Sequence, residues 1–491
     1  MAKNAIVIGA GIAGIASAIR LQSIGLTVTV FESNNHPGGK LHQKQLNGFR
    51  FDMGPSLFTM PWLVDELFQL CNKNPKDYFK YIRKDTICNY FWEDGTRFYA
   101  SGNRTRFCLE ASKTFEEPEK NIEKFLVQNQ VKYEHTKSVF LEKSLHKLNT
   151  YLSKETLQAF LKIGGMGINK TLNDVNRKNF NNEKLIQFFN RFATYNGSSP
   201  YKTPGIMSMI PHLEMDLGTY FPKGGMYQIT ESLYQLAKDI GVQFRFNETI
   251  NQIVISNQKA IGVKTDLEMH PSDVVVSNMD VYPTYKKLLP NQKDPKKVLE
   301  QERSSSALIF YWGINREFPE LDLHNIFFSE DYRKEFNHIF NSKTLSEDPT
   351  VYVNISSKEE PSDAPKGNEN WFVMINAPGN YGQDWTSLKA AARKNIINKL
   401  NRILGCSLED LIMEEMVWEP IGIEEQTSSY RGALYGAASN SKFAAFLRHP
   451  NFSKRISGLY FCGGSVHPGG GIPLSLLSAK IVGDLVKNER E

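Results

Sequence analysis

Short apolar runs separated by glycine-containing breaks occupy the first forty residues. The run from Ala5 to Ile8 is typical of a buried strand, and so is the run from Val28 to Phe31. Between them, apolar residues recur at helical spacing from Ile12 to Ile24, which predicts a helix with one buried face. The order strand, helix, strand predicts a β-α-β unit with two parallel strands.

The rest of the chain alternates between two kinds of pattern. Residues 62–201 are mostly helical in pattern and rich in charge, as in Glu116 to Leu152, which predicts a separate helix-rich substrate region. Residues 458–486 follow the order strand, glycine-rich loop, helix, and Pro361 to Asn370 is a polar loop. Further strands are predicted at Val242–Phe246, Ile250–Ile255, Ala260–Lys264, Val274–Val276, Ser306–Gly313 and Val351–Ile355.

A glycine pattern follows the first predicted strand and opens the predicted helix. Gly9 permits a tight turn, Gly11 lets the backbone approach a pyrophosphate, and Gly14 lets the helix pack closely on the sheet. The helix N-terminus adds N–H groups and a positive dipole. Glu32 ends the second strand, where a carboxylate accepts hydrogen bonds from ribose hydroxyls. These features predict a dinucleotide site, and a glycine-rich turn with nothing bound is the alternative.

A second glycine pair, Gly38-Gly39, comes shortly after Glu32 and is followed by Gly54-Pro55-Ser56. A glycine pair just past the ribose-binding strand lets another backbone segment reach the pyrophosphate, which suits a buried and permanently held dinucleotide. This arrangement favours FAD over NAD. Lys40 is expected to place a positive charge near the phosphates, and a solvated loop lysine is the alternative.

The glycine-rich loop near the C-terminus is predicted to serve the flavin end of the cofactor. Gly463-Gly464 and Gly469-Gly470-Gly471 precede a helix that begins near Ile472, with Pro473 in its first turn. The positive N-terminus of such a helix favours the negative charge of reduced flavin and so helps a hydride to be accepted. A turn that serves only chain reversal is the alternative.

Two side chains near this loop are predicted to be structural. His467 has no Asp, Glu or Cys partner close in sequence, so we expect a loop histidine near the flavin without a catalytic role. Cys462 ends an apolar strand, so we expect a small buried residue and no covalent flavin link. The sequence contains no metal-binding pattern and no nucleophile motif, and no catalytic residue is predicted.

Composition narrows the class of protein. The chain has 491 residues, 41% of them apolar and 23% charged, which is typical of a globular protein of two or three domains. A net charge of +5 without a Lys/Arg cluster does not support nucleic-acid binding, but it allows a mild attraction to anionic lipid. Five dispersed cysteines without a C-x-x-C pair indicate a reducing compartment.

Targeting signals are weak. The run from Ala5 to Ile19 imitates a signal peptide, but its glycines are better explained by a nucleotide site. No other window approaches the roughly 20 apolar residues that a membrane-spanning helix needs. We therefore expect a cytoplasmic protein whose membrane contact is peripheral.

These motifs resemble the bacterial phytoene-desaturase-like family of carotenoid desaturases and isomerases, which are FAD oxidoreductases. The resemblance spans nearly the whole chain. Within the family, Ala193–Lys202 and Phe461–His467 look most like the branch that introduces the 3,4 double bond into 1-hydroxylated acyclic carotenoids. The motifs that carry the family resemblance are Gly9–Gly14 with Glu32, His36–Lys40, Phe49–Ser56, Tyr220–Met226 and His467–Pro473.

The resemblance implies further FAD contacts. Ile250 matches the position whose backbone meets the adenine, and Ile12 and Ala13 match contacts in the first helical turn. Lys40 stands where many relatives carry Arg, which keeps the charge but loses the bidentate fork. The cofactor-binding residues predicted in all are Gly9, Gly11, Ile12, Ala13, Gly14, Glu32, Gly38, Gly39, Lys40, Gly54, Pro55, Ser56, Ile250, Gly463, Gly464, Gly471 and Ile472.

The predicted fold class is α/β, with a Rossmann-type FAD-binding domain interleaved with a mixed sheet-plus-helical substrate domain. The FAD-binding domain is assigned residues 1–75, 225–285 and 415–491. The substrate domain, partly helical and facing a membrane, is assigned residues 76–224 and 286–414.

The resemblance implies an FAD-dependent desaturation in which an allylic C–H of an acyclic carotenoid loses a hydride to flavin. Phe188–Tyr195 and Met207–Phe221 are candidates for the wall of a long substrate tunnel, or else ordinary core. Tyr195, Asn196 and Ser198 are candidate partners for a substrate hydroxyl.

Other partners and functions stay open at this point. The expected partners are a lipophilic carotenoid, a membrane surface, and an electron acceptor that is oxygen or a quinone; nucleic acid is not expected. Alternative functions are a phytoene desaturase, a carotenoid saturase or isomerase, an FAD amine oxidase, and a non-enzymatic carotenoid-binding or flavin-binding protein.

Overall fold

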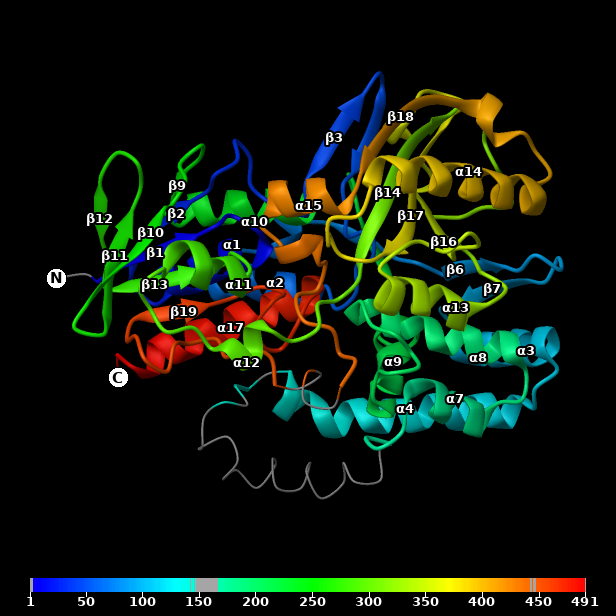
Figure 1. Ribbon diagram of the computed structural model, residues 1–491, viewed down its shortest axis with the longest axis horizontal. Coiled ribbons are helices and arrows are strands. Elements are labelled where there is room, and N and C mark those ends of the chain that lie inside the picture. Colours follow the sequence, from blue (N-terminus) through cyan, green and yellow to red (C-terminus); the bar gives the residue numbers. More distant parts are fainter. Residues whose placement is uncertain are drawn as a thin grey trace.

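Five parallel strands form the first sheet, in the order β19-β13-β1-β2-β9. The computed structural model describes residues 3–490 apart from residues 142, 145, 147–166, 442–443 and 445–446. The strands come from the beginning, middle and end of the chain, so distant segments meet in one sheet (Figure 1). Their bounds are β1 Asn4–Ile8, β2 Thr27–Phe31, β9 Gln243–Arg245, β13 Val274–Ser277 and β19 Leu459–Phe461.

The two faces of this sheet are covered differently. In β1, Ala5 and Val7 join the apolar cluster formed with the helices, whereas Ile6 and Ile8 join a cluster with the second covering layer. That layer is a three-stranded antiparallel sheet of β10 Gln252–Ser256, β11 Lys259–Lys264 and β12 Met269–Pro271. The helices on the first face are α1 Ile12–Ser23, α2 Trp62–Leu70, α10 Gln228–Asp239 and α17 Ile472–Asn488.

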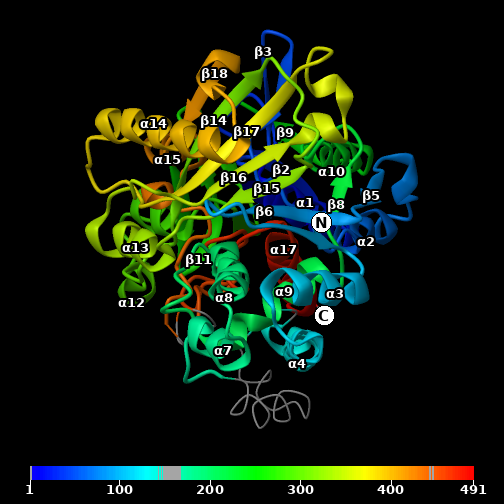
Figure 2. The ribbon, with the colours of Figure 1, turned by 90° about the vertical axis from the view of Figure 1, so that its right-hand side faces the viewer.

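A seven-stranded mixed sheet lies beside the first, in the order β18-β14-β17-β16-β15-β6-β7. Helix α14, Trp385–Leu404, packs on one face, and a group of helices covers the other (Figures 1 and 2). The strands are β6 Thr86–Phe91, β7 Arg97–Ser101, β14 Ser306–Ile314, β15 His324–Phe327, β16 Val351–Ile355, β17 Glu369–Ala377 and β18 Ile412–Trp418. The covering helices are α3 Arg104–Phe115, α4 Glu119–Phe140, α7 Leu172–Asn179, α8 Glu183–Asn190 and α9 Ile210–Met215.

Smaller elements connect the two sheets. Two short antiparallel pairs are formed by the hairpin of β3 Gln43–Leu46 with β4 Phe49–Asp52, and by β5 Tyr81–Arg83 with the distant β8 Tyr220–Pro222. The remaining helices are α11 Val281–Pro283, α12 Lys296–Leu299, α13 Tyr332–Asn337 and α15 Pro420–Thr427.

The predicted fold class is confirmed, and each predicted strand overlaps an observed one. The prediction for residues 62–201 was wrong in part, because residues 81–101 form strands. Their apolar run is buried on both sides of β6, and such a run has no periodicity that separates strand from helix. The segment from Glu116 contains α4, whereas residues 147–152 lie outside the described part of the chain.

Three further details differ from expectation. Besides the strands within residues 81–101, strands β3, β4, β8, β12, β15, β17 and β18 were not predicted. The polar loop from Pro361 to Asn370 ends in the first two residues of β17. The predicted domain boundary at residue 415 falls inside β18, which pairs with β14 of the second sheet. The run that imitates a signal peptide forms β1 and the buried part of α1.

Candidate cofactor site

The loop after β1 is built so tightly that only glycine fits at two of its positions. Gly9 has a φ of 97°, and its amide donates to the Phe31 carbonyl oxygen at 2.7 Å. A Cβ on Gly14 would collide with the Gly9 carbonyl oxygen, so this glycine lets α1 lie close to the strand. Helix α1 begins at Ile12 with no side-chain cap and no acidic residue in its first turn, which leaves the amides of Ile12 and Ala13 suited to an anion.

The second glycine pair meets the first glycine loop in space, as the sequence predicts. The Gly38 amide donates to the Ala10 carbonyl oxygen at 2.8 Å, and Gly11 and Gly38 form a parallel bridge. A Cβ on Gly39 would lie 3.4 Å from the Gly11 Cα. Two backbone segments without side chains therefore lie against each other, and together they could hold a pyrophosphate.

Glu32 anchors this loop from the end of β2. Its side chain is buried, and its Oε2 accepts from the Ala10 amide at 2.7 Å. Its Oε1 accepts from the Asn34 amide at 2.9 Å and from Asn34 Nδ2 at 2.7 Å. The amide of Glu248 donates to the Glu32 carbonyl oxygen, which brings the segment leading to Ile250 beside Glu32. Ile250 itself points its side chain into the core below the sheet.

Lys40 is not a solvated loop lysine. Its ammonium donates to the carbonyl oxygens of Leu434 at 3.1 Å and Ala433 at 3.3 Å. Burial lowers its pKa to about 8; Asp280 opposes this shift and Arg303 adds to it. Asp280 and Arg303 form a close buried ion pair. A cation whose charge is disfavoured in this way gains from a nearby phosphate.

The C-terminal loop is the third glycine-rich segment of the candidate site. Gly463 has a φ of 103°, and its amide donates to Ser478 Oγ of α17 at 2.8 Å. Gly464 lies so close to Gly470 that a Cβ would be 3.2 Å from the Gly470 Cα. Gly471, with a φ of 98° and open space around it, precedes Ile472, where α17 begins without a side-chain cap.

Asn278 lies between the glycine loop after β1 and the C-terminal glycine loop. This role was not predicted from the sequence. Asn278 follows β13, and its amide donates to the Ile8 carbonyl oxygen at 2.8 Å. A Cβ on Gly11 would lie 2.6 Å from its Oδ1, and a Cβ on Gly463 would lie 2.6 Å from its Nδ2. The available signal was its position just past the carboxyl end of a central parallel strand, where ligands of such sheets bind.

Gly54-Pro55-Ser56 lies apart from the phosphate loops, at the contact between the two sheets. The Gly54–Pro55 bond is cis, and a Cβ on Gly54 would lie 3.5 Å from the Phe372 ring of β17. Ser56 Oγ lies 2.8 Å from the Tyr352 hydroxyl of β16. This segment therefore links the cofactor loops to the second sheet.

His467 and Cys462 are both buried next to the C-terminal glycine loop. His467 is buried, its Nε2 lies 2.9 Å from the Lys143 carbonyl oxygen, and burial lowers its pKa to about 3, so the ring is neutral. Cys462 is buried, and burial raises the pKa of its thiol to about 12, which makes it unreactive. Neither side chain is placed to transfer protons at neutral pH.

Arg448 is a second residue that the sequence did not point to. Its guanidinium is fully buried and donates to the carbonyl oxygens of Tyr435 at 2.5 Å and Gly464 at 3.2 Å. Burial lowers its pKa to about 10. It holds the segment around Tyr435 against the C-terminal glycine loop.

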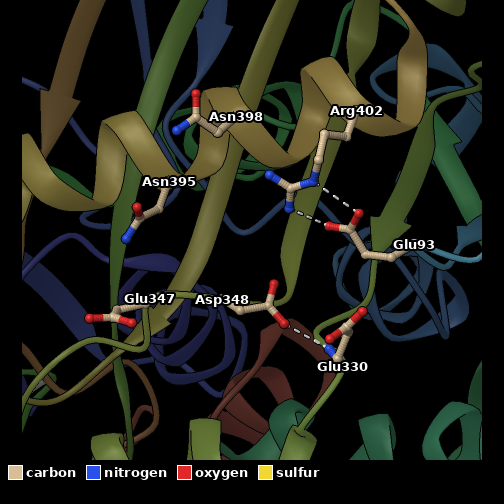
Figure 3. Close-up of a pocket in the computed structure, with 7 residues that line it drawn as sticks. All are labelled: Glu93, Glu330, Glu347, Asp348, Asn395, Asn398 and Arg402. Atoms are coloured by element: carbon tan, nitrogen blue, oxygen red, sulfur yellow. Dashed lines mark hydrogen bonds and ion pairs between the residues drawn. The ribbon is translucent and has the colours of Figure 1, made fainter.

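A separate surface pocket of about 280 Å³ lies beside α14 (Figure 3). Its wall is polar, and an ion pair between Arg402 and Glu93 crosses it. None of its residues belongs to the predicted cofactor set, and its polarity does not suit an apolar ligand. The lining residues are Glu93, Glu330, Glu347, Asp348, Asn395, Asn398 and Arg402.

The described residues contain no cluster of three or more His, Cys, Asp or Glu side chains that could hold a metal ion. Among the helices of the described segments, none is both long and apolar enough to cross a bilayer.

Known proteins are similar to this chain in sequence and in fold. The chain is 61% identical over 486 residues to a 1-hydroxycarotenoid 3,4-desaturase of Flavobacterium sp., with 99% of both chains covered. It is 32% identical to a 4,4'-diapolycopene oxygenase of Methylomonas sp., with 99% of this chain and 98% of that protein covered. These matches confirm the resemblance predicted from the sequence motifs.

The similarity extends to solved structures at much lower identity. An oxidoreductase from Methanosarcina mazei superposes with a TM-score of 0.63 at 16% identity, covering 99% of this chain and 100% of that one. Putrescine oxidase superposes with a TM-score of 0.63 at 13% identity, covering 100% and 99%. Residues 12–486 match the family described as flavin containing amine oxidoreductase. The chain therefore belongs to the family of flavin-containing amine oxidoreductases, which confirms the predicted FAD cofactor.

Proposed function

We propose that this protein is an FAD-dependent desaturase of acyclic carotenoids, and that it forms the 3,4 double bond of a 1-hydroxycarotenoid. The observation that carries the proposal is the 61% identity, over 99% of both chains, to a protein described as a 1-hydroxycarotenoid 3,4-desaturase. The likeness to putrescine oxidase lies far below this identity and shows the fold alone.

The cofactor would be held by the glycine loops and their neighbours. The first turn of α1 and the backbone at Gly11 and Gly38-Gly39 would receive the pyrophosphate, Lys40 would balance its charge, and Glu32 would accept from the ribose. The positive N-terminal end of α17 would stabilise the negative charge that the flavin gains on reduction. When bound, FAD would supply the two-electron acceptor for the hydride of an allylic C–H bond.

The protein's own contribution is positioning and exclusion of water. A polyene has no charged handle, and conjugation spreads the positive charge left after hydride loss, so orientation of the chain matters more than an acid or base. The neutral His467 and the inert Cys462 fit a site without side-chain proton transfer. Phe188 and Met207, both in the apolar cluster between the helices and the second sheet, are candidates for the wall of the substrate tunnel.

We also propose that the chain is divided into a cofactor-binding domain and a substrate-binding domain. The first sheet and its helices would hold the cofactor, and the second sheet with helices α3, α4, α7, α8 and α9 would hold the substrate. The exposed side chains of Val127 and Val131 lie one turn apart on α4 and support peripheral contact with a membrane. Electrons would leave to oxygen or to a quinone.

Anaerobic mixing tests the proposed reaction. A 1-hydroxylated acyclic carotenoid in liposomes should bleach the flavin band and give a product with one more conjugated double bond, and it should do so much faster than phytoene. Equal or faster reduction by phytoene would assign the general phytoene-desaturase activity. An oxygenated product, or reduction by amines only, would refute the proposal. Sedimentation with neutral and anionic liposomes tests the membrane contact.

A further inference from the structure

The helix-facing side of the second sheet carries a short line of polar side chains in an otherwise apolar surface. His324 of β15 pairs with Asn354 of β16, and Tyr352 pairs with Ile326 on the same face. Ile326 and Tyr352 pack in the apolar cluster under the helices. His324 is 3% exposed and Asn354 is 6% exposed, so water does not surround either side chain.

The hydrogen bonds of this line fix the position of the histidine proton. Asn354 Nδ2 donates to the Leu323 carbonyl oxygen at 2.9 Å, which sets the orientation of the amide. The same nitrogen lies 3.2 Å from His324 Nδ1 and can only donate to it. His324 Nδ1 is therefore an acceptor. Burial lowers the pKa of the ring to about 3, so the single proton of the neutral ring is on Nε2.

The hydrogen bonds continue from His324 through Tyr352 to Ser56, and the direction of each can be assigned. The Tyr352 hydroxyl lies 2.7 Å from His324 Nδ1 and must donate to it. It has no second proton, so at its 2.8 Å contact with Ser56 it accepts from Ser56 Oγ. His324 is thus two hydrogen bonds away from a residue of the segment that links the cofactor loops to this sheet.

The N–H of His324 Nε2 lies at the other end of this hydrogen-bond network. It is buried and has no hydrogen-bond partner within the described part of the protein. Folded proteins rarely leave a buried donor unpaired, and such a group calls for a bound ligand or water. The orientation derived above means that an oxygen which accepts a hydrogen bond is the matching ligand.

The proposed substrate places such an oxygen close to the reacting bond. In a 1-hydroxycarotenoid only C2 separates the carbon that bears the hydroxyl from the nearer carbon of the 3,4 bond. The group that binds the hydroxyl must therefore lie close to where the flavin meets the chain. Ser198 is not a free donor for this hydroxyl, because its own hydroxyl already donates to the Asn196 carbonyl oxygen at 2.9 Å and accepts from the Ser439 amide at 2.8 Å.

We infer that His324 is a specificity-determining residue whose Nε2–H donates to the tertiary hydroxyl of the substrate. The inference rests on the proposed function. A substrate without the hydroxyl would leave this donor unpaired in an apolar site, and sites of that kind discriminate strongly against the analogue that lacks the partner.

The test compares two substrates that differ only in the hydroxyl. Anaerobic flavin bleaching gives kcat/KM for a 1-hydroxylated acyclic carotenoid and for its analogue with hydrogen at that position, both in liposomes. His324→Leu should lower the ratio of the two values about tenfold or more, mainly by slowing the hydroxylated substrate. His324→Gln, which keeps an N–H near the same place, should restore part of the ratio. Tyr352→Phe is the matched control. It removes a hydroxyl of the same hydrogen-bond network, but Asn354 still donates to Nδ1 and so keeps the proton on Nε2.

The outcomes separate the inference from the function on which it rests. An unchanged ratio in His324→Leu, or an equal loss on both substrates, would overturn the role of His324 and leave the desaturase proposal standing. Reduction of the wild-type flavin by neither substrate would refute the desaturase proposal itself. A second measurement needs no variant: with the flavin reduced, the hydroxylated carotenoid should shift one buried Nε2–H signal of ¹⁵N-histidine-labelled protein, and the analogue should not. Identical spectra with the two carotenoids would also overturn the inference.

Discussion

Replacement of Glu32 should damage both the empty protein and its affinity for FAD. The Ala10 amide, on a fully buried residue, donates to Glu32 Oε2, so Glu32→Ala leaves it without an acceptor. An unpaired buried donor costs about 1–3 kcal/mol, and we expect the free energy of unfolding of the flavin-free protein to fall by that amount. The lost ribose hydrogen bond to a charged group costs about 1.5–3 kcal/mol more in binding, which is roughly a 10- to 150-fold increase in Kd.

Glu32→Gln sharpens this prediction. Every group that contacts the two carboxylate oxygens, including the Ala10 amide and both nitrogens of Asn34, is a donor. A glutamine must turn its NH₂ group towards one of these donors, so it should lose nearly as much as alanine. Ser33→Ala is the control, because its hydroxyl contacts Glu32 only at 3.3 Å. Fluorescence titration of the apoprotein with FAD and the Tm without FAD give the two quantities. Wild-type values of both in Glu32→Gln would refute the role assigned to this carboxylate.

Three further predictions concern the same site. Gly11→Val should lower bound flavin below that of Glu32→Ala, since even a Cβ would lie 2.6 Å from Asn278 Oδ1; unchanged flavin per chain would show that the loop is not the phosphate site. Burial lowers the pKa of Lys40 to about 8 from 10.5, so the unfolded chain binds more protons between these values and the flavin-free protein should become more stable as pH rises from about 8 to 10.5. Nearby phosphates should reverse that shift, and calorimetry at pH ~9 in buffers of different ionisation heat should detect proton uptake on FAD binding that Lys40→Met abolishes. Because Cys462 is buried with a thiol pKa of about 12, iodoacetamide should leave it unmodified in the native protein and modify it after denaturation, as mass spectrometry would show.

The cofactor loops could be predicted from the sequence because their geometry demands glycine. Gly9 needs a positive φ, and Gly14 needs the absence of a Cβ, so the residue type itself records the structural constraint. The residue types of Asn278 and His324 do not reveal their structural roles in this way. Their roles depend on pairings such as β13 with β1 and β15 with β16, which join residues far apart in the chain.

The second sheet was harder to predict for the same reason. Strand β6 pairs with β15, so Asn89 lies opposite Asn325, and no local pattern announces that contact. β18 has no fully buried residue before Trp418, so its hydrophobic signal is weak. The predicted hydroxyl partner Ser198 is occupied by backbone groups, which only the folded chain reveals.

The position of β19 and α17 has a consequence for how the protein acquires its cofactor during synthesis. β19 pairs with β13, and α17 packs on α1, so the sheet begun by residues 4–8 is closed by residues 459–488. Closing contacts over such a separation is slow, and it cannot begin before α17 has emerged from the ribosome. A nascent chain would therefore carry an incomplete dinucleotide pocket until then. Loading with FAD then becomes a late event in folding, and cellular flavin supply at that moment would set the yield of active protein.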